Sequence, residues 1–291
     1  ALGSEFYTPE QIAATANGSD PYLYPNVNWM DQIFTKNSSN ASASVSIRGG
    51  GERARYYVTA AYIRDNGNLY TNPDTDYSTN IHITRYNFRS NIDLNLTKST
   101  VLTLELGANM TDAHQPATVA SSTEYSSKVS SLFTHVYNMN PTSMPVRVPI
   151  GYDESGEVEW GWGTSSTGGT NPAERLFGSG YNKTYNTQIL SQLILKQDLS
   201  MLTPGLSANV SFSYDYYTQS IQARTKTSST YMVLGVNDDT GLYDLSVREG
   251  QEFLSYGHST TGNRADELKA QINYDRNFND RHRVGAMAMY Y

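Results

Sequence analysis

The chain has 291 residues, a formal net charge of −7 and no cysteine. These features exclude disulfides, thiol nucleophiles and cysteine-ligated metals, and the acidic charge argues against a nucleic acid as partner. No stretch approaches the ~18 consecutive apolar residues that a membrane-spanning helix needs. Tyrosines outnumber phenylalanines by 23 to 8; their amphipathic rings suit membrane–water interfaces, although tyrosine also favours ordinary strands.

The N-terminal segment, residues 1–40, differs from the rest and is predicted to be a connector. Thr8 followed by Pro9 and Glu10 predicts a short helix, because threonine caps a helix and proline fits its first turn. A cluster of turn residues follows at 17–21. The start of the sequence has no charged stretch leading into an apolar one, so we expect no signal peptide within it.

From residue 41 to 291, stretches of about ten residues alternate apolar and polar side chains, as strands of a membrane barrel do. In Tyr86–Leu96 the even positions are mostly apolar and the odd positions are polar, and 206–216 and 268–275 repeat the pattern. Each stretch therefore has one apolar and one polar face, because strand side chains point alternately to opposite sides. The pattern predicts eight strands in four hairpins: 41–48 with 53–64, 85–96 with 101–111, 184–199 with 206–217, and 264–278 with 282–291.

The connections between these strands are alternately short and long. The short ones carry glycine, proline or small polar residues, which is typical of hairpins, at 49–52, 97–100, 203–205 and 279–281. The long ones run for about twenty, seventy and forty-five residues, more than most loops in compact domains. Outer-membrane barrels alternate short periplasmic turns with long extracellular loops. The sequence therefore predicts an all-β, antiparallel transmembrane β-barrel, either part of a larger barrel or a closed barrel of eight strands.

The alternation assigns individual side chains to the two faces of the predicted barrel wall. One face would meet lipid, where a charge near mid-membrane costs roughly 2–4 kcal/mol, and the other would meet water or a plug. The predicted lipid-facing residues are Leu94, Leu96, Leu102, Leu104, Leu193, Leu195, Val210 and Phe212. The predicted lumen-facing residues are Arg89, Asp93, Glu105, Gln192, Lys196, Asp215, Lys269 and Asp275. The solvated face of a soluble sheet is the alternative explanation for these charges.

The long connection at 112–183 is where we expect ligand or partner contacts, because loops often carry function. Apolar residues at helical spacing predict a loop helix over 122–138. Tyr152, Trp160 and Trp162 place flat rings beside glycines, as sugar-stacking and peptide-binding surfaces do. They are predicted substrate or partner contacts, and closure of their own loop explains them equally well.

Neither a catalytic centre nor a firm metal site emerges from the sequence. No pair among the five histidines has metal-binding spacing, and no serine-hydrolase, zinc-protease or phosphate-loop motif is present, so we expect no enzyme. Asp74, Asp76 and the run 237–239 could hold calcium in loops, but they lack the ligand count and glutamate of an EF-hand. Ordinary turns explain them better, so no cofactor is predicted and loop calcium is the weaker alternative.

Several motifs in combination resemble the SusC/RagA type of TonB-dependent transporter. The run VNWMDQIF at 27–34 is followed by a strand, the turn at 49–52 and a Tyr-Tyr strand, an order similar to the plug-to-barrel junction and first hairpin of that family. Similar residues recur at 65–69, 86–91 and 170–173, the last of which contains Asn171, a further predicted contact. The resemblance extends over residues 20–291.

The resemblance implies an importer in the outer membrane of Bacteroidota-type bacteria that takes up glycans or oligopeptides. It also implies a SusD-like surface lipoprotein that covers the barrel, and TonB, which acts through an N-terminal segment. The sequence shows no plug and no TonB box, so we expect a fragment, with residues 41–291 as the N-terminal part of the barrel. The tryptophans and tyrosines slightly favour glycans over peptides.

A soluble β-sandwich that binds glycans, or an adhesin domain, is the alternative from another class. In a sandwich the apolar faces of the strands pack against a second sheet, whereas in a barrel wall they meet lipid. A dry centre closed around Leu94, Leu104 and Phe212 would therefore contradict the barrel.

Overall fold

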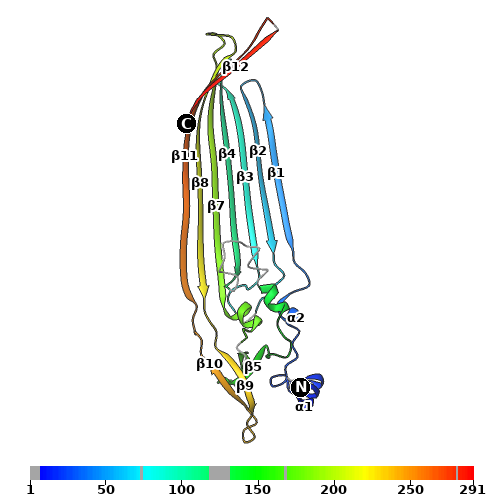
Figure 1. The fold of residues 1–291 in the computed structure, drawn as a ribbon. Coiled ribbons are helices and arrows are strands. Elements are labelled where there is room, and N and C mark those ends of the chain that lie inside the picture. Colours follow the sequence, from blue (N-terminus) through cyan, green and yellow to red (C-terminus); the bar gives the residue numbers. More distant parts are fainter. Residues whose placement is uncertain (1–6, 73–74, 118–131, 167–168, 280) are drawn as a thin grey trace.

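The computed structural model describes residues 7–72, 75–117, 132–166, 169–279 and 281–291. Its largest part is a sheet of eight long strands in the order β1-β2-β3-β4-β7-β8-β11-β12 (Figure 1). All neighbouring pairs are antiparallel, so the predicted all-β antiparallel class is confirmed. The strands are β1 (Asn40–Gly50), β2 (Ala54–Asn66), β3 (His82–Asn95), β4 (Thr100–Pro116), β7 (Gly180–Asp198), β8 (Leu206–Thr225), β11 (Ser255–Phe278) and β12 (His282–Tyr290).

The sheet is open within the residues that the structure describes. Strands β1 and β12 form its two edges and do not pair with each other. All eight predicted strands are present, and their order follows the chain because each hairpin pairs with the next. The closed eight-stranded barrel is therefore contradicted, and a section of a larger wall is the arrangement that the sheet fits.

The strands reach further toward the long connections than the sequence predicts. Strand β8 continues to Thr225 and pairs there with Ser255, the first residue of β11, so their connection is shorter than expected. The long connections contain a second sheet in the order β10-β9-β6-β5. Its strands are β5 (Arg147–Tyr152), β6 (Val158–Gly163), β9 (Thr230–Val236) and β10 (Tyr243–Arg248). These strands were not predicted because they are too short to show clear alternation.

The tight turns lie together at one end of the large sheet, and the long connections lie at the other (Figure 1). Gly205, in the turn between β7 and β8, has φ +89°. Its missing side chain also matters, because a Cβ there would collide with the carbonyl oxygen of Asp275. Glycine is therefore required at this turn for both its backbone conformation and the close approach of the next strand.

The described part of the N-terminal segment lies with the long connections and not with the tight turns (Figure 1). Helix α1 (Pro9–Asn17) is confirmed, with Thr8 as its cap, and α2 (Trp29–Ile33) follows. The segment is tied to the long connections by Val27, whose N–H donates to the Pro141 carbonyl at 2.9 Å, and by a β-bridge from Phe34 to Leu69. The connector assignment stays a prediction, but the position of the segment is established.

The buried core of the described residues lies at the same end. Helix α2 and the helical residues 132–137 pack there with Ile83 of β3 and with the π-helical turn η2 (Glu174–Gly178). Residues 122–131 of the predicted loop helix lie outside the described part. The core residues are Trp29, Ile33, Leu69, Ile81, Ile83, Leu132, Val136, Met144, Ala173 and Leu176. Among the described residues, no helix is long and apolar enough to cross a membrane.

Candidate functional site

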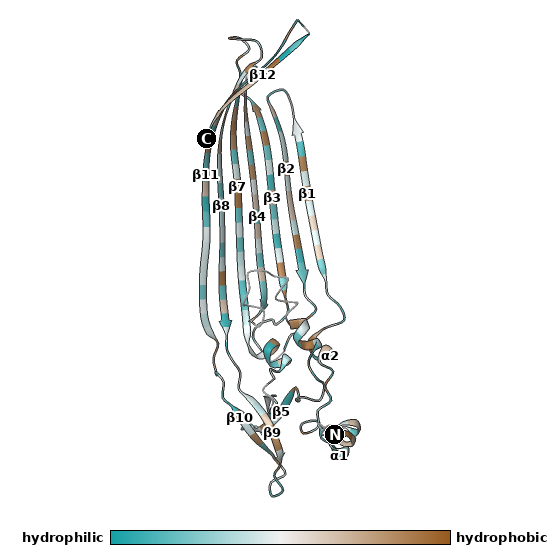
Figure 2. Cartoon of the chain, in the orientation of Figure 1, coloured by the Kyte–Doolittle hydropathy of each residue, from teal (hydrophilic) through white to brown (hydrophobic). Residues whose placement is uncertain are grey.

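The large sheet has one apolar face, and the register shows it directly. Leu104 pairs with Leu193, which pairs with Phe212, and all three point to the same side because paired residues share a face. Apolar and polar segments alternate along each strand (Figure 2). The predicted lipid-facing residues fall on this side: Leu94, Leu102, Leu104, Leu193, Leu195, Val210, Phe212 and, one residue beyond β3, Leu96.

No second layer covers this apolar face in the described part of the chain. Phe212 is 46% exposed and Leu193 is 42% exposed. The buried core contains none of the predicted lipid-facing residues and lies at the long-connection end. A sandwich would bury these side chains between two sheets, so the sandwich alternative is contradicted.

The apolar residues on this face form an oblique band. Phe88, Ile189 and Arg264 belong to one cross-strand row, yet the first two lie in the band and the third lies beyond it. From β2 to β11 the edge of the band moves from Tyr62 to Leu268, a little over one residue per strand. With about 3.3 Å per residue and about 4.8 Å between strands, the strands are inclined by about 40° to the normal of the band. Membrane barrels incline their strands by about 35–45°.

The height and the edge of the band also fit a bilayer. On β4 the band runs from Leu102 to Met110, roughly 26 Å along the strand and about 20 Å once inclined, near the apolar height of ~25 Å of outer-membrane barrels. At its edge nearer the long connections, the rings of Tyr62 and Tyr86 are in tilted contact with centroids 5.5 Å apart. Tyrosines at such an edge are typical of a membrane–water interface.

The opposite face is polar and carries the predicted lumen-facing residues. Within it, Asp93 accepts a hydrogen bond from Thr103 at 2.8 Å and lies 3.6 Å from Arg55. The register places on this one face all eight residues: Arg89, Asp93, Glu105, Gln192, Lys196, Asp215, Lys269 and Asp275. Arg89, Glu105, Gln192 and Asp215 line a groove of about 520 Å³ on this face. The face opposite the apolar band is therefore a charged surface that suits contact with water.

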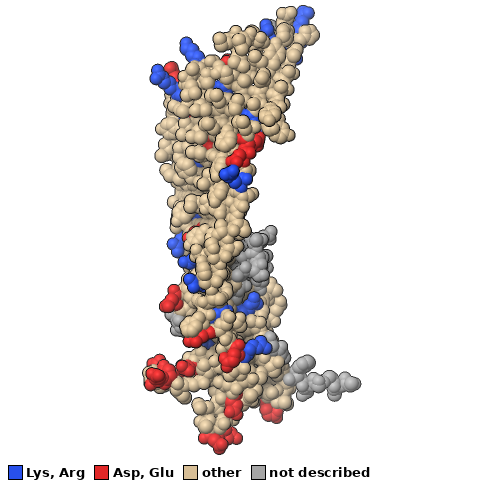
Figure 3. Space-filling model, turned by 90° about the vertical axis from the view of Figure 1, so that its left-hand side faces the viewer, with Lys and Arg blue, Asp and Glu red and all other residues tan. Residues whose placement is uncertain are grey.

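A cap built from the long connections packs against the end of this polar face. Ile83 in the core belongs to the same face as Arg89, since both are odd-numbered residues of β3. Acidic residues gather at this end of the molecule in the view of Figure 3, whereas basic ones are spread along its length. The acidic side chains include Asp153, Glu154 and Glu157 in the β5–β6 hairpin and Asp238 and Asp239 in the β9–β10 hairpin.

Asn171 is a structural residue of this cap, so its predicted contact role is wrong. Its side chain is 1% exposed. The Nδ2 group donates to the carbonyl oxygens of Pro145, Val146 and Gly163 at 3.2, 2.9 and 2.9 Å. The Oδ1 atom accepts from the N–H groups of Ala173 and Glu174. The amide is fully used within the loop and presents nothing to a ligand.

Trp160 and Trp162, by contrast, come together in a cleft of the cap of about 550 Å³. Trp160 is 47% exposed. Trp162 stacks on Phe177 with centroids 6.3 Å apart, and the guanidinium carbon of Arg147 lies 4.5 Å from the centroid of its ring. Other residues that line the cleft are Asp31, Gln32, Tyr70, Thr71, Asn72 and Val146. The cleft combines flat rings with both signs of charge.

Of the four predicted contact residues, Asn171 and Tyr152 do not line this cleft, and sequence reasoning missed others that lie beside it. Tyr152 is 62% exposed in the β5 strand and does not line the cleft. Tyr22 was not singled out, although its ring packs near Trp160, at 6.1 Å, and against Tyr243, at 5.4 Å. Its approach to β10 joins segments more than two hundred residues apart, as the hydrogen bond from Tyr243 to Asp20 does. No local pattern could have indicated such a contact.

The possible calcium loops behave as ordinary turns where they are described. The side-chain oxygen of Asn237 accepts from the N–H groups of Asp239 and Thr240, at 3.0 and 3.2 Å. Within the described residues no group of three or more acidic or histidine side chains is placed to hold a metal. Asp74 lies outside the described residues. Calcium binding stays an untested alternative.

Comparison with known proteins yields structural neighbours only. No protein-family model and no curated protein matches the chain. The RagAB peptide importer in its closed-closed state matches at a TM-score of 0.56 and 12% identity, over 91% of this chain and 25% of that one. A second RagAB peptide transporter structure gives 0.55 and 12%, over 91% and 25%. The importer in its open-open state gives 0.56 and 12%, over 98% and 29%.

These matches establish the fold of the chain. It spans between a quarter and a third of the length of the solved chains that it resembles. The sequence resemblance to SusC/RagA-type transporters is thereby confirmed at the level of fold, for a section of the larger structure.

Proposed function

We propose that this chain forms part of the barrel wall and outer cap of an outer-membrane importer of the SusC/RagA type. The observation that carries the proposal is the oblique apolar band on one face of a sheet whose other face is polar and charged. In a membrane barrel the apolar residues of inclined strands must lie at one level along the membrane normal, because the hydrocarbon layer occupies that level. A soluble sheet has no such constraint. The match to a solved importer supports the same conclusion.

The proposal orients the molecule. The tight turns lie in the periplasm and the long connections face the outside, as in other outer-membrane barrels. Residues 7–39 then belong to the outer cap, because Val27 and Phe34 contact the long connections. They would not be a connector that enters from the periplasmic side. The polar face with Arg89 and Glu105 lines the passage, and the wall performs no chemical step.

We further propose that the cargo is an oligopeptide that first meets the cleft around Trp160. The neighbouring structures are of a peptide importer. The cleft places Arg147 and Asp31 beside its rings, and opposite charges near aromatic surfaces suit a zwitterionic chain. Glycan uptake is the second candidate, which the exposed ring of Trp160 favours.

The proposed partners follow from the same orientation. A SusD-like lipoprotein would cover the outer cap and contact the acidic tips of the β5–β6 and β9–β10 hairpins, and charge complementarity would guide its approach. TonB would act through the plug of the whole importer.

The test uses the full-length protein that carries this chain, in the bacterium that encodes it. Deletion of the gene should abolish growth on an oligopeptide mixture and leave growth on free amino acids unchanged. Restoring the gene with Trp160→Ala and Trp162→Ala should raise the peptide concentration needed for half-maximal uptake by about three- to tenfold, the value of one or two lost ring contacts.

Tyr137→Ala is the matched control, since Tyr137 is an exposed aromatic residue of the same cap outside the cleft. It should leave uptake unchanged. Loss of growth on a polysaccharide in place of peptides would replace the peptide proposal by the glycan candidate. Unchanged growth on both would contradict the importer itself.

A further inference from the structure

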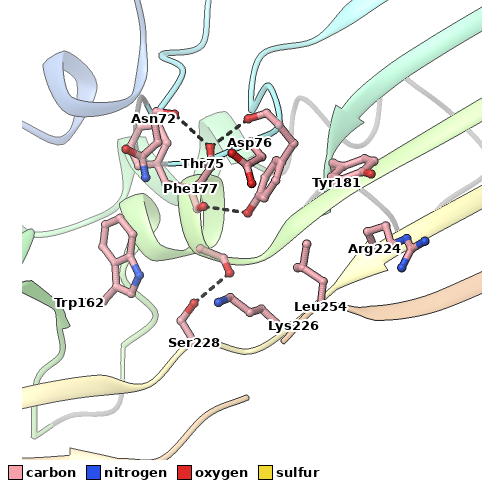
Figure 4. Close-up of a pocket in the computed structure, with 12 residues that line it drawn as sticks. Asn72, Thr75, Asp76, Trp162, Phe177, Tyr181, Arg224, Lys226, Ser228 and Leu254 are labelled. Atoms are coloured by element: carbon pink, nitrogen blue, oxygen red, sulfur yellow. Dashed lines mark hydrogen bonds between the residues drawn. The ribbon is translucent and has the colours of Figure 1, made fainter. Parts of the chain in front are cut away.

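A second cleft lies beside the first, at the point where β7 and β8 enter the cap (Figure 4). It has a volume of about 520 Å³ and shares Asn72, Trp162 and Phe177 with its neighbour. Its distinguishing residues are two cations, Arg224 and Lys226, and the ring of Tyr77. The remaining lining is Thr75, Asp76, Gly178, Tyr181, Ser228 and Leu254.

The strand residues of this cleft belong to the outward face of the wall. Tyr181 pairs with Arg224, and Arg224 pairs with Tyr256. The alternation along β7 and β8 places Tyr181 on the side of Leu193, and Arg224 on the side of Phe212. Cargo passes along the opposite, polar face. A ligand of Tyr181 and Arg224 would therefore come from the surroundings of the barrel.

The cations of this region have no carboxylate partner at ion-pair distance among the described residues. The guanidinium carbon of Arg224 lies 4.5 Å from the centroid of the Tyr256 ring, and the Lys183 ammonium lies 5.9 Å from that of Tyr181. The Lys226 ammonium donates to the backbone carbonyl of Glu252 at 3.1 Å. Asp76 is the acidic residue in the described lining. The balance of charge in the cleft favours an anion.

Rings and a hydroxyl accompany these cations. Tyr77 and Tyr181 have ring centroids 5.1 Å apart, and Ser228 lines the cleft and donates its hydroxyl to the Gly178 carbonyl. The hydroxyl of Tyr77 donates to the Phe177 carbonyl at 3.2 Å, which holds the ring in place. Flat apolar surfaces beside cations match a sugar that carries a phosphate or carboxylate.

The height of the cleft selects among membrane anions. Tyr216 is the last band residue of β8, and Arg224 follows eight residues later. That separation is about 26 Å along the strand and, at an inclination of about 40°, about 20 Å above the band. A phospholipid headgroup layer is only about 5–7 Å thick in each leaflet. A phospholipid phosphate does not reach Arg224, but a lipid headed by several sugars does.

We propose that this cleft binds an anionic sugar group of a glycolipid in the outer leaflet. The proposal rests on the proposed function, because it uses the membrane position of the wall. The bound glycolipid would anchor the importer and set the height of the barrel in the outer leaflet, independently of cargo.

The test uses the full-length protein, purified in a neutral detergent, with lipopolysaccharide, a phosphorylated glycolipid, as the probe. Arg224→Gln combined with Lys226→Gln should weaken lipopolysaccharide binding by about tenfold or more, because two charge-assisted contacts are lost. The control pair is Lys36→Gln with Arg248→Gln, which removes the same charge from the same end outside both clefts. The control should bind as the parent protein does.

A second variant guards against loss of folding. Arg224→Lys with Lys226→Arg keeps both charges and should retain most of the binding, and the heat-dependent gel mobility of each variant reports whether its barrel is formed. Equal binding by the Gln pair and the parent protein would overturn the proposal. The proposal would also be overturned if the Gln pair lost binding to vesicles of phosphatidylethanolamine with phosphatidylglycerol as strongly as it lost binding to lipopolysaccharide. Full competition of lipopolysaccharide binding by inorganic phosphate would overturn it too, since either result would indicate a general anion site.

Failure of the proposed function is separable from these outcomes. If the protein inserts into vesicles and restores uptake, but the parent protein and the Gln pair bind lipopolysaccharide equally, only the glycolipid site is contradicted. A protein that does not insert contradicts the membrane wall.

Discussion

The side-chain amide of Asn171 donates a hydrogen bond to the carbonyl oxygen of Gly163 at 2.9 Å and so joins the start of η2 to the end of β6. Asn171→Ala would remove the side-chain donor from the carbonyls of Pro145 and Gly163, at about 1–3 kcal/mol for each buried carbonyl left unpaired, whereas the Val146 carbonyl still accepts from the N–H of Gly163. We expect the cap to lose about 2 kcal/mol, which corresponds to roughly thirtyfold faster cleavage of its loops in limited proteolysis.

Asn171→Asp should be at least as damaging, although it is nearly isosteric. A carboxylate can still accept from Ala173 and Glu174 but cannot donate to the three carbonyls. Asn109→Ala, at an exposed position in β4, is the matched control and should leave the cleavage rate unchanged. Parent-like protection of the Asn171→Asp variant would contradict the donor role.

The two faces of β7 allow a direct test of the membrane assignment with neighbouring residues. Leu193→Arg would place a charge on the apolar face and should cost about 2–4 kcal/mol of folding free energy in lipid vesicles, measured by urea titration. Gln192→Arg would place the same charge on the polar face, beside Glu105, and should cost less than about 1 kcal/mol.

The contrast between these two variants decides between the two environments. Similar small costs would mean that water meets both faces, and the barrel wall would be refuted. A larger cost for Gln192→Arg would mean that the faces have been assigned the wrong way round.

The long strands could be predicted because a single local rule, alternation, repeats through all of them. Leu104, Leu193 and Phe212 come from three strands, yet each could be assigned to a face from its own neighbours in sequence. Strand ends were less accurate near the cap. There the outward side chains become polar, as at Arg224, and the contrast between the faces disappears although the ladder continues.

The cap could not be predicted in the same way, because its contacts join distant segments. The burial of Asn171 depends on carbonyls from residues 145, 146 and 163, which no spacing rule connects. The place of the N-terminal segment depends on Val27 meeting Pro141. One sequence signal could have placed this segment, namely the direction of β1. Because β1 ends at a tight turn, it must begin at the long-connection end, and the segment that precedes it must lie there too.

Protonation of Glu174 gives the cap a pH dependence. Burial raises the pKa of this carboxyl group, while the N–H of Ser228 and the charge of Arg175 act in the opposite direction. A raised pKa means that the folded cap holds the proton more tightly than the unfolded chain does. The resulting stabilisation is complete below the ordinary value of 4.5 and is lost as the pH rises through the raised pKa.

Glu174→Gln mimics the protonated group, so its advantage over the parent protein in limited proteolysis should grow as the pH rises from 4 toward neutrality. Comparing the two proteins cancels other titrating groups such as His135. Glu157→Gln, in an exposed turn, should show no such growing advantage. A constant difference at all pH values would contradict the assignment to Glu174.

The inclination of the strands can be measured with two residues that belong to one cross-strand row. Phe88 and Arg264 are linked through Ala108, Ile189 and Tyr216, so in an upright wall they would lie at equal depth. In the inclined wall Phe88 lies in hydrocarbon and Arg264 lies above it. The chain has no cysteine, so Phe88→Cys and Arg264→Cys can each carry one fluorescent label at a known place. Brominated lipid chains should quench the first label several-fold more than the second.

Leu268→Cys, on the same strand as Arg264 but inside the band, is the control and should be quenched as strongly as Phe88→Cys. Equal quenching at Phe88 and Arg264 would mean that the strands are upright. The height of Arg224 above the band, which depends on the inclination, would then be wrong as well.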